Sequence, residues 1–305
     1  MSPNRPVTRA ALPFELFVQR LKDTHNPLEE FPGTWTGKGF NLIARPDFQN
    51  GKPFFLELNG TFETLEFTEI GGAIPNRGSV QKDIQLHGIH YLQQVADCET
   101  LGALHIEPGL WIHVVDTADP KNPVSMVVRQ ATIPHGDSLL AQSTFVKVVP
   151  TGPTIAPVFS VPFTDAVIPG LNAAATKPET NPTYLDQYLN PRQFEKCCLP
   201  SGLDLKAVVK DPTEVLRAAI QGQPIEKTVV IQISTVAAAG STGILNIPFV
   251  VKNANAAQMD AIFWIETVHP KGEDAFLQLQ YVQRVILNFL DIHWPHISVA
   301  TLVKQ

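Results

Sequence analysis

Cysteine is scarce in this 305-residue sequence, which contains only three. Two of them, Cys197 and Cys198, are adjacent, and neighbouring residues rarely bridge without strain, so the set does not form a disulfide framework. The sequence also lacks a CxxC pair and any Cys/His spacing typical of a metal site. We therefore expect Cys98, Cys197 and Cys198 to be reduced and structural.

The sequence also lacks an excess of basic over acidic residues and any long apolar run. The formal net charge of -6 disfavours a nucleic-acid partner, because phosphate binding needs a basic surface. No unbroken apolar run approaches the ~20 residues that a membrane-spanning helix requires. The first residues carry positive charge but lack the clean apolar core and the cleavage site of a signal peptide. These absences predict a cytoplasmic chain without a membrane span.

Familiar catalytic motifs are absent as well. The sequence contains no nucleophile elbow, phosphate-binding loop, HExxH zinc motif or dinucleotide fingerprint. His135, Asp137 and Ser138 follow one another in "PHGDS", but this stretch is more typical of a polar hairpin turn than of a catalytic triad. Any reaction is therefore expected to depend on a bound cofactor.

Two blocks of alternating apolar and polar residues, 30–149 and 226–305, read as antiparallel strands rich in β-branched and aromatic residues. Between them, residues 150–225 contain eleven prolines, so a continuous central strand is excluded there. Asn181-Pro182, Asn190-Pro191 and Asp211-Pro212 predict the starts of short helices within this segment. We interpret it as an inserted lid or brace; a disordered linker is the alternative.

The predicted fold is all-β. About ten antiparallel strands would hide their edges best by closing into a barrel in which the first and last strands pair. Residues 29–305 are thus predicted to form a single barrel interrupted by the insertion 150–225. The alternative is two domains, in which each strand block closes separately. Residues 1–28 are predicted to be an extension with a short amphipathic helix, because apolar residues recur there at helical spacing.

The stretch "GTWTGKG" opens the first strand block with three glycines around one tryptophan. Each glycine would cost a helix interior about 1 kcal/mol, so a helix is excluded. On an extended strand, Gly33, Trp35, Gly37 and Gly39 share one face, where small residues permit a sharp bend or a close backbone approach beside a large ring. The stretch predicts the opening strand of a strongly bent sheet.

This G-x-W-x-G-x-G pattern resembles the first strand of the calycins, lipocalin-like barrels that bind small ligands, and is most similar to their nitrobindin branch of heme-binding barrels. The final segment, "IHWPHISVATLVKQ", is similar to the last strand of that branch, where a histidine precedes a short alternating apolar run. The resemblance covers residues 30–149 and 226–305 and is most specific at the two ends. It implies a calycin-type barrel whose interior is closed at one end by Trp35. The insertion has no counterpart in the family, whose domain is shorter.

The resemblance further implies that His296 binds the iron of heme b as its axial ligand. Heme iron accepts a neutral imidazole nitrogen. The open side of the heme would then bind nitric oxide or react with peroxide or peroxynitrite, so an activity, if present, would be that of a peroxidase or a peroxynitrite isomerase. A zinc site formed by His293 and His296 is disfavoured, since residues three apart on a strand face opposite sides.

Three further residues are candidates for lining the cofactor pocket. His113 shares a strand face with Trp111, so both would line the pocket if that face is interior. His90 is the third candidate. The alternative for both His113 and His90 is a polar residue of a half-buried strand whose hydrogen bonds are satisfied within the protein. Two other functions stay open: a cofactor-free carrier of a fatty acid or another lipophilic ligand, and a structural or interaction barrel. A homo-oligomer is compatible with all three functions.

Overall fold

The computed structural model describes residues 26–116, 124–192, 199–236 and 243–305. The predicted N-terminal helix and the adjacent cysteines lie outside these residues. Among the described residues, no helix is both long and apolar enough to cross a membrane.

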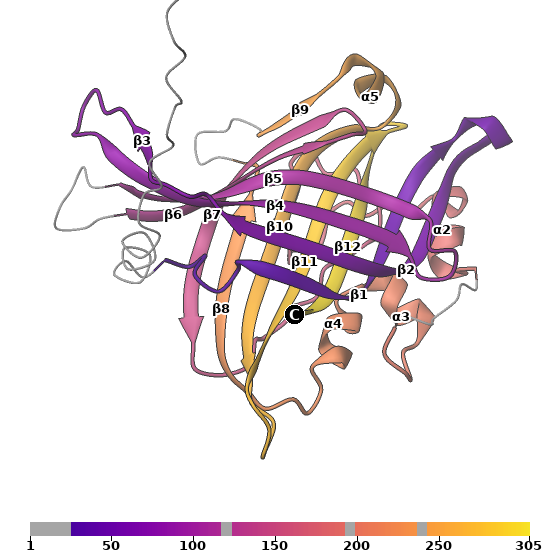
Figure 1. Ribbon diagram of the computed structural model, residues 1–305. Helices are drawn as coiled ribbons and strands as arrows, with labels where there is room; N and C mark the ends of the chain where they lie inside the picture. Colours follow the sequence, from indigo (N-terminus) through magenta and orange to yellow (C-terminus); the bar gives the residue numbers. More distant parts are fainter. Residues whose placement is uncertain (1–25, 117–123, 193–198, 237–242) are drawn as a thin grey trace, which may run out of the picture.

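Ten long strands form one closed antiparallel sheet (Figure 1). The order around the sheet is β2-β1-β12-β11-β10-β8-β7-β6-β5-β4, and the ring is completed where β4 pairs with β2. The short strands β3 (Ile74–Asn76) and β9 (Ile244–Asn246) pair with β4 and β7. The prediction of a closed all-β barrel of about ten strands is thereby confirmed. The ten strands are β1 (Gly33–Asp47), β2 (Lys52–Glu69), β4 (Ile84–Asp97), β5 (Ala103–Asp116), β6 (Val124–Ile133), β7 (Asp137–Val149), β8 (Ile225–Ser234), β10 (Asn255–Val268), β11 (Phe276–Phe289) and β12 (Ile292–Lys304).

The first and last strands pair, as the sequence predicts, from Trp35 opposite Lys304 to Leu42 opposite Ile297. The glycines of β1 permit this pairing. A Cβ atom added to Gly37 would lie 2.1 Å from the backbone oxygen of Thr301, and one added to Gly39 would be almost as close to β12. Backbone atoms cannot yield at such distances, so the close approach of β1 to β12 requires glycine.

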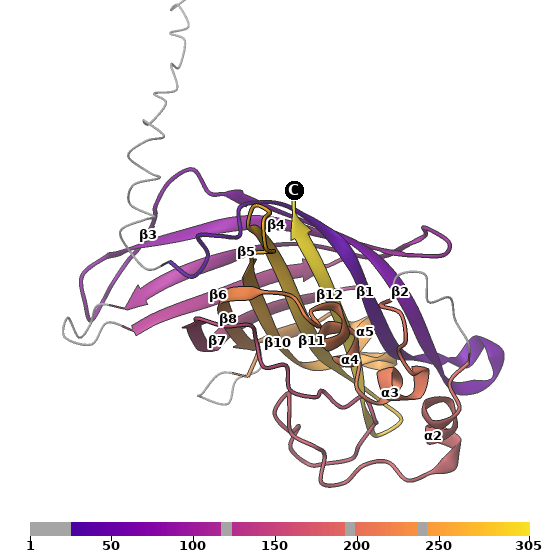
Figure 2. The ribbon, with the colours of Figure 1, turned by 90° about the horizontal axis from the view of Figure 1, so that it is seen from below.

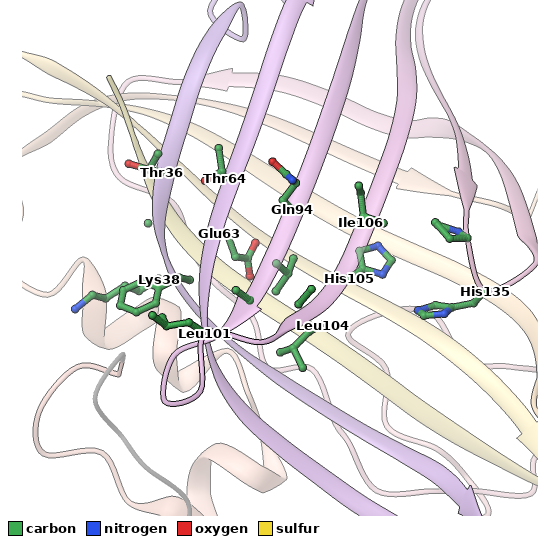
Figure 3. A pocket seen from close by; sticks show the side chains of 16 residues that line it. Thr36, Lys38, Glu63, Thr64, Gln94, Leu101, Leu104, His105, Ile106 and His135 are labelled. Atoms are coloured by element: carbon green, nitrogen blue, oxygen red, sulfur yellow. The ribbon is translucent and has the colours of Figure 1, made fainter.

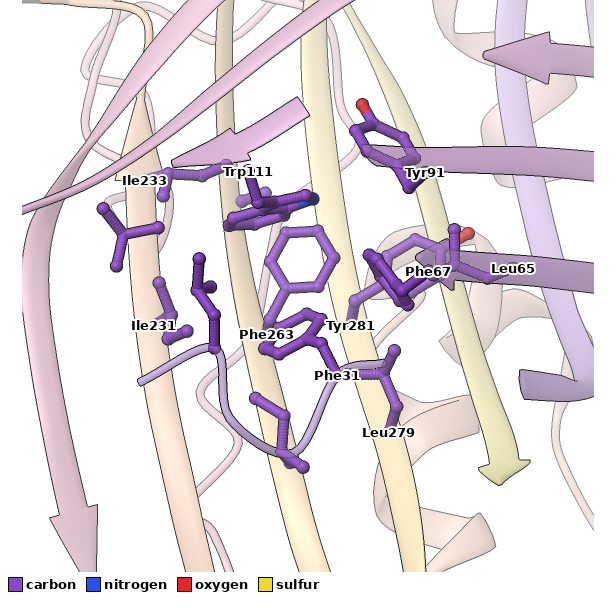
Figure 4. Packing of buried hydrophobic residues seen from close by; sticks show 14 of the residues in the cluster. Phe31, Leu65, Phe67, Tyr91, Trp111, Ile231, Ile233, Phe263, Leu279 and Tyr281 are labelled. Atoms are coloured by element: carbon purple, nitrogen blue, oxygen red, sulfur yellow. The ribbon is translucent and has the colours of Figure 1, made fainter. Parts of the chain in front are cut away.

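Trp35 is fully buried in an apolar cluster that fills one end of the barrel interior. Its indole Nε1 donates a hydrogen bond to the backbone oxygen of Phe31, 2.7 Å away. Phe31 in turn packs edge-to-face on Phe67 and lies beside Trp111 (Figure 4). Since successive strand residues alternate between faces, this cluster identifies which row of each strand faces the interior.

The insertion packs against the outer face of β1 and β12 (Figures 1 and 2). Val209 and Leu216 of the insertion join a second buried cluster with Phe40 and Val299 of the barrel. Arg284 of β11 donates a 2.7 Å hydrogen bond to the backbone oxygen of Pro169, which ties the insertion to the sheet. The insertion contains the short helices α2 (Pro182–Leu189), α3 (Leu205–Lys210) and α4 (Glu214–Ala219). Two others, η1 (Phe48–Asn50) and α5 (Pro248–Asn253), lie outside it.

The three predicted helix starts in the insertion differ in outcome. Asn190 is the C-cap of α2, and the residues that would follow Asn190-Pro191 in a helix lie mostly outside the described ranges. Asn181 caps α2, and its side-chain oxygen accepts from the backbone N–H of Thr183. Helix α4 begins at Glu214, two residues later than the Asp211-Pro212 pair predicts. Asp211 is instead the C-cap of α3. Its carboxylate accepts a hydrogen bond from the backbone N–H of Val158, which ties α3 to an earlier part of the insertion.

Candidate functional site

Polar side chains replace apolar ones in the middle of the barrel interior. Glu107 of β5 and Arg129 of β6 form a fully buried ion pair with an N–O distance of 2.5 Å. The hydroxyl of Tyr91 donates to Glu107 and accepts a 2.9 Å hydrogen bond from Arg129. Gln283 accepts a further hydrogen bond from Arg129. The network spans the interior from β4 to β11.

Burial alone would raise the pKa of the Glu107 carboxyl, but the adjacent Arg129 charge outweighs it. Hydrogen bonds from His105 and Tyr91 act in the same direction as Arg129, so the pKa of Glu107 lies well below its usual range. Glu107 is therefore ionised and neutralises Arg129. The buried guanidinium is consequently not free to bind the carboxylate of a ligand.

A second buried carboxyl, Glu63 of β2, lies in the same polar layer. It accepts hydrogen bonds from the Tyr281 hydroxyl at 2.5 Å and the Thr61 hydroxyl at 3.0 Å. Burial raises the pKa of Glu63, and these hydrogen bonds only partly offset it. Glu63, Glu107 and Arg129 thus form a buried polar group among the apolar side chains of the interior.

His296 of β12 lies on the same strand row as the interior residue Ala300 and opposite Val285 of β11. Its Nε2 atom is 2.7 Å from Oδ1 of Asn41, and the same oxygen accepts from the Ser298 hydroxyl at 2.9 Å. An amide oxygen can only accept, so Nε2 carries the hydrogen and Nδ1 keeps the lone pair. Burial, together with His105 and His135, lowers the pKa of His296 to about 3. The imidazole is therefore neutral at physiological pH.

His105 and His135 lie near each other and act electrostatically on His296. Their ring centroids are 6.1 Å apart. Strands β5 and β6 pair with Gly109 opposite Ala131, and extending this register by four residues places His105 opposite His135. Sequence reasoning did not identify this pair, although the register of the hairpin was the signal that could have found it.

A pocket of about 730 Å³ opens beside these two histidines (Figure 3). His105 and His135 form part of its wall; Lys38 also borders it, with its ammonium over the ring of Phe62. None of the four candidates from sequence lines it. The lining residues are Thr36, Gly37, Lys38, Phe62, Glu63, Thr64, Gln94, Val95, Ala96, Leu101, Ala103, Leu104, His105, Ile106, Pro134 and His135.

The structure places the other candidates away from His296. Trp111 and His113 both belong to the interior row of β5. Trp111, however, packs within the apolar cluster against Phe263, with the two ring centroids 4.9 Å apart. His113 is buried, and its Nε2 is 2.6 Å from the Ser125 hydroxyl. His90 is exposed on the outer face of β4. The neighbours of His296 are thus His105 and His135 rather than these three residues.

The residues around His296 fit the heme that the sequence resemblance implies. A neutral imidazole whose other nitrogen is held by a hydrogen-bond acceptor is the form that binds a metal. In the described ranges, no group of three or more His, Cys, Asp or Glu side chains could hold a metal ion by itself. His293 is engaged elsewhere, since its ring contacts Asn288 at 2.6 Å and the backbone of Asp165 in the insertion.

Similarity to known proteins is found among solved structures. No protein-family model matches the sequence, and no curated protein matches it. Among solved structures, the chain is similar to the crystal structure of Rv2717c from M. tuberculosis, with 14% sequence identity and a TM-score of 0.41. The match covers 93% of this chain and 96% of the other. The function must therefore be argued from the residues of the site.

Proposed function

We propose that the barrel binds heme b at its histidine-containing end, with His296 as the ligand of the iron. The observation that supports this proposal is the state of His296: a neutral imidazole whose Nε2 hydrogen is held by Asn41. Asn41 and Ser298 fix the orientation of the ring before any ligand enters, which reduces the ordering cost of binding.

Other residues would hold the remainder of the cofactor. His105 and His135 act electrostatically on His296 and border the pocket of about 730 Å³, whose wall also includes Val95, the residue of β4 that pairs with His105. When bound, the heme would supply an iron that takes up nitric oxide or reacts with peroxides. The protein residues would bind and orient the group and limit its access to water.

A cofactor-free carrier of a lipophilic ligand is the second candidate. The pocket volume falls within the range of about 300–1,000 Å³ that small-molecule sites occupy. Two observations weigh against a fatty acid that runs through the barrel. The apolar end is filled by Trp35, Trp111 and Phe263, and the interior Arg129 is already neutralised by Glu107.

Titration of the apo protein with hemin, followed by absorbance in the Soret region, tests the heme proposal. Wild type should bind saturably with one-to-one stoichiometry. His296→Ala should lose binding or change its spectrum, because the iron loses its ligand. His90→Ala is the matched control: it also removes one imidazole, but from the exposed outer face of β4, so it should behave as wild type.

Asn41→Leu supplies an intermediate case, since it keeps His296 but removes the acceptor that fixes its tautomer. Its hemin affinity should lie between those of wild type and His296→Ala. Thermal melts of each variant show whether the fold is intact. Indistinguishable hemin spectra for folded wild type and His296→Ala would refute the proposal, and displacement of a lipophilic fluorescent probe by fatty acids would then test the second candidate.

A further inference from the structure

His105 and His135 are two metal-ligating side chains on the wall of one pocket. His105 is partly exposed and His135 is exposed, so an ion in solution can reach both. His105 lies on β5, and His135 lies in the β6–β7 turn, two residues after the end of the strand that pairs with β5. Neither ring is needed for the proposed contact between His296 and heme iron.

The separation of the two rings suits a shared ion. Zinc binds imidazole nitrogen at about 2.0–2.1 Å, so two imidazoles on one tetrahedral ion have centroids roughly 5 Å apart, and about 6 Å apart at wider angles. The observed separation is 6.1 Å. A shared ion would require the exposed His135 side chain to turn one ring nitrogen toward His105.

Each histidine also has a carboxylate beside it. His105 Nε2 is 3.4 Å from Oε2 of Glu107, so an imidazole hydrogen on Nε2 would point to Glu107 and leave Nδ1 as the free donor atom. Asp137 interacts electrostatically with His135, and its Oδ1 is buried without a hydrogen-bond partner among the described residues. Metal-binding histidines are typically oriented by a carboxylate of this kind.

We propose that His105 and His135 form a binding site for one divalent first-row transition-metal ion, such as Zn²⁺. Two protein ligands leave the remaining coordination positions to water or to a molecule in the pocket. Imidazole donors suit Zn²⁺, Cu²⁺ and Ni²⁺ rather than Mg²⁺ or Ca²⁺. The site is distinct from the proposed heme ligand and does not depend on heme binding.

The test is calorimetric titration of the full-length, heme-free protein with ZnCl₂ near neutral pH. Wild type should show saturable one-to-one binding, which His105→Ala and His135→Ala should each weaken at least tenfold. Asp137→Asn should weaken it less than either histidine variant does, by no more than about tenfold, the lower end of the range for such orienting carboxylates. His296→Ala and His90→Ala should bind Zn²⁺ as wild type does.

A second readout identifies the donor atoms. With Cu²⁺ in place of Zn²⁺, electron paramagnetic resonance should report two nitrogen donors in wild type and one in either histidine variant. If the folded His105→Ala and His135→Ala variants bind Zn²⁺ as tightly as wild type, any bound ion lies elsewhere and the proposal is refuted. Loss of binding in His296→Ala alone would also refute it, because the ion would then belong to the proposed heme ligand.

Discussion

Replacing Glu266 with glutamine should make the protein more stable, and increasingly so as the pH rises. Glu266 lies on β10 with no exposed surface. One carboxylate oxygen accepts a 2.6 Å hydrogen bond from Gln278, and the other has no hydrogen-bond partner in the part of the chain that the structure describes. Gln278 also exchanges hydrogen bonds with Gln223 of the insertion. An ionised Glu266 would thus be stabilised by one hydrogen bond among the described residues, from the side-chain amide of Gln278.

Burial raises the pKa of Glu266 from 4.5 to about 7, and the hydrogen bond from Gln278 only partly opposes this. The folded state therefore holds a proton that the unfolded state has released between about pH 4.5 and 7, and the free energy of unfolding falls as the pH rises through this window. At about 1.4 kcal/mol per pKa unit, the loss above pH 7 amounts to about 3 kcal/mol. Glutamine cannot ionise, so the Glu266→Gln variant does not lose this unfolding free energy.

Urea denaturation of wild type and Glu266→Gln at about pH 4 and about pH 8 measures the effect. Because other groups titrate identically in both proteins, the difference in unfolding free energy isolates Glu266. That difference should be small at the lower pH and should approach about 3 kcal/mol in favour of the variant at the higher pH. Glu273→Gln removes a carboxylate from the exposed β10–β11 turn and serves as the control. A difference that does not vary with pH would refute the reasoning.

Two further predictions concern packing. Gly37→Ala should destabilise the protein by about 2–3 kcal/mol in chemical denaturation, because the new Cβ meets backbone atoms of β12; Gly71→Ala, where no atom lies within 4 Å, is the control, and equal stability of the two variants would contradict the close approach. Tyr188→Phe should be neutral or stabilising by up to about 1 kcal/mol, since its buried hydroxyl has no hydrogen-bond partner among the described residues. A clear loss of melting temperature in Tyr188→Phe would show that the hydroxyl has a partner.

Strand positions and barrel closure could be predicted from the sequence because both follow from local patterns. Alternation with period two is visible in each strand, and ten strands leave closure as the best way to hide their edges. The glycines beside Trp35 predicted a close backbone approach, and the structure assigns it to β12. The choice of partner strand required the further argument that the first and last strands meet.

The composition of the site was harder to predict, because it depends on which face of each strand is interior. His90 shares its face with Leu92, which suggests burial, yet the interior row of β4 contains Ile89, Tyr91 and the polar Gln93. The interior of this barrel is partly polar, so apolar neighbours are a poor guide to the inner face. The pairing of His105 with His135 depends on hairpin register, and their proximity to His296 depends on closure of the whole ring.

The insertion covers the outer face of one side of the barrel. Strand β10 is buried without a break from Gln258 to Glu266, since the interior cluster covers one face and the insertion covers the other. Such strands lose the alternating pattern that half-exposed strands show. His296 lies on the insertion-covered side between the buried residues Pro295 and Ile297, whereas the histidines of β5 and the β6–β7 turn lie on the solvent-facing side. A ligand at this end would therefore meet the imidazole of His296, which Asn41 orients, from one wall of the barrel, and the partly exposed His105 and the exposed His135 from the other.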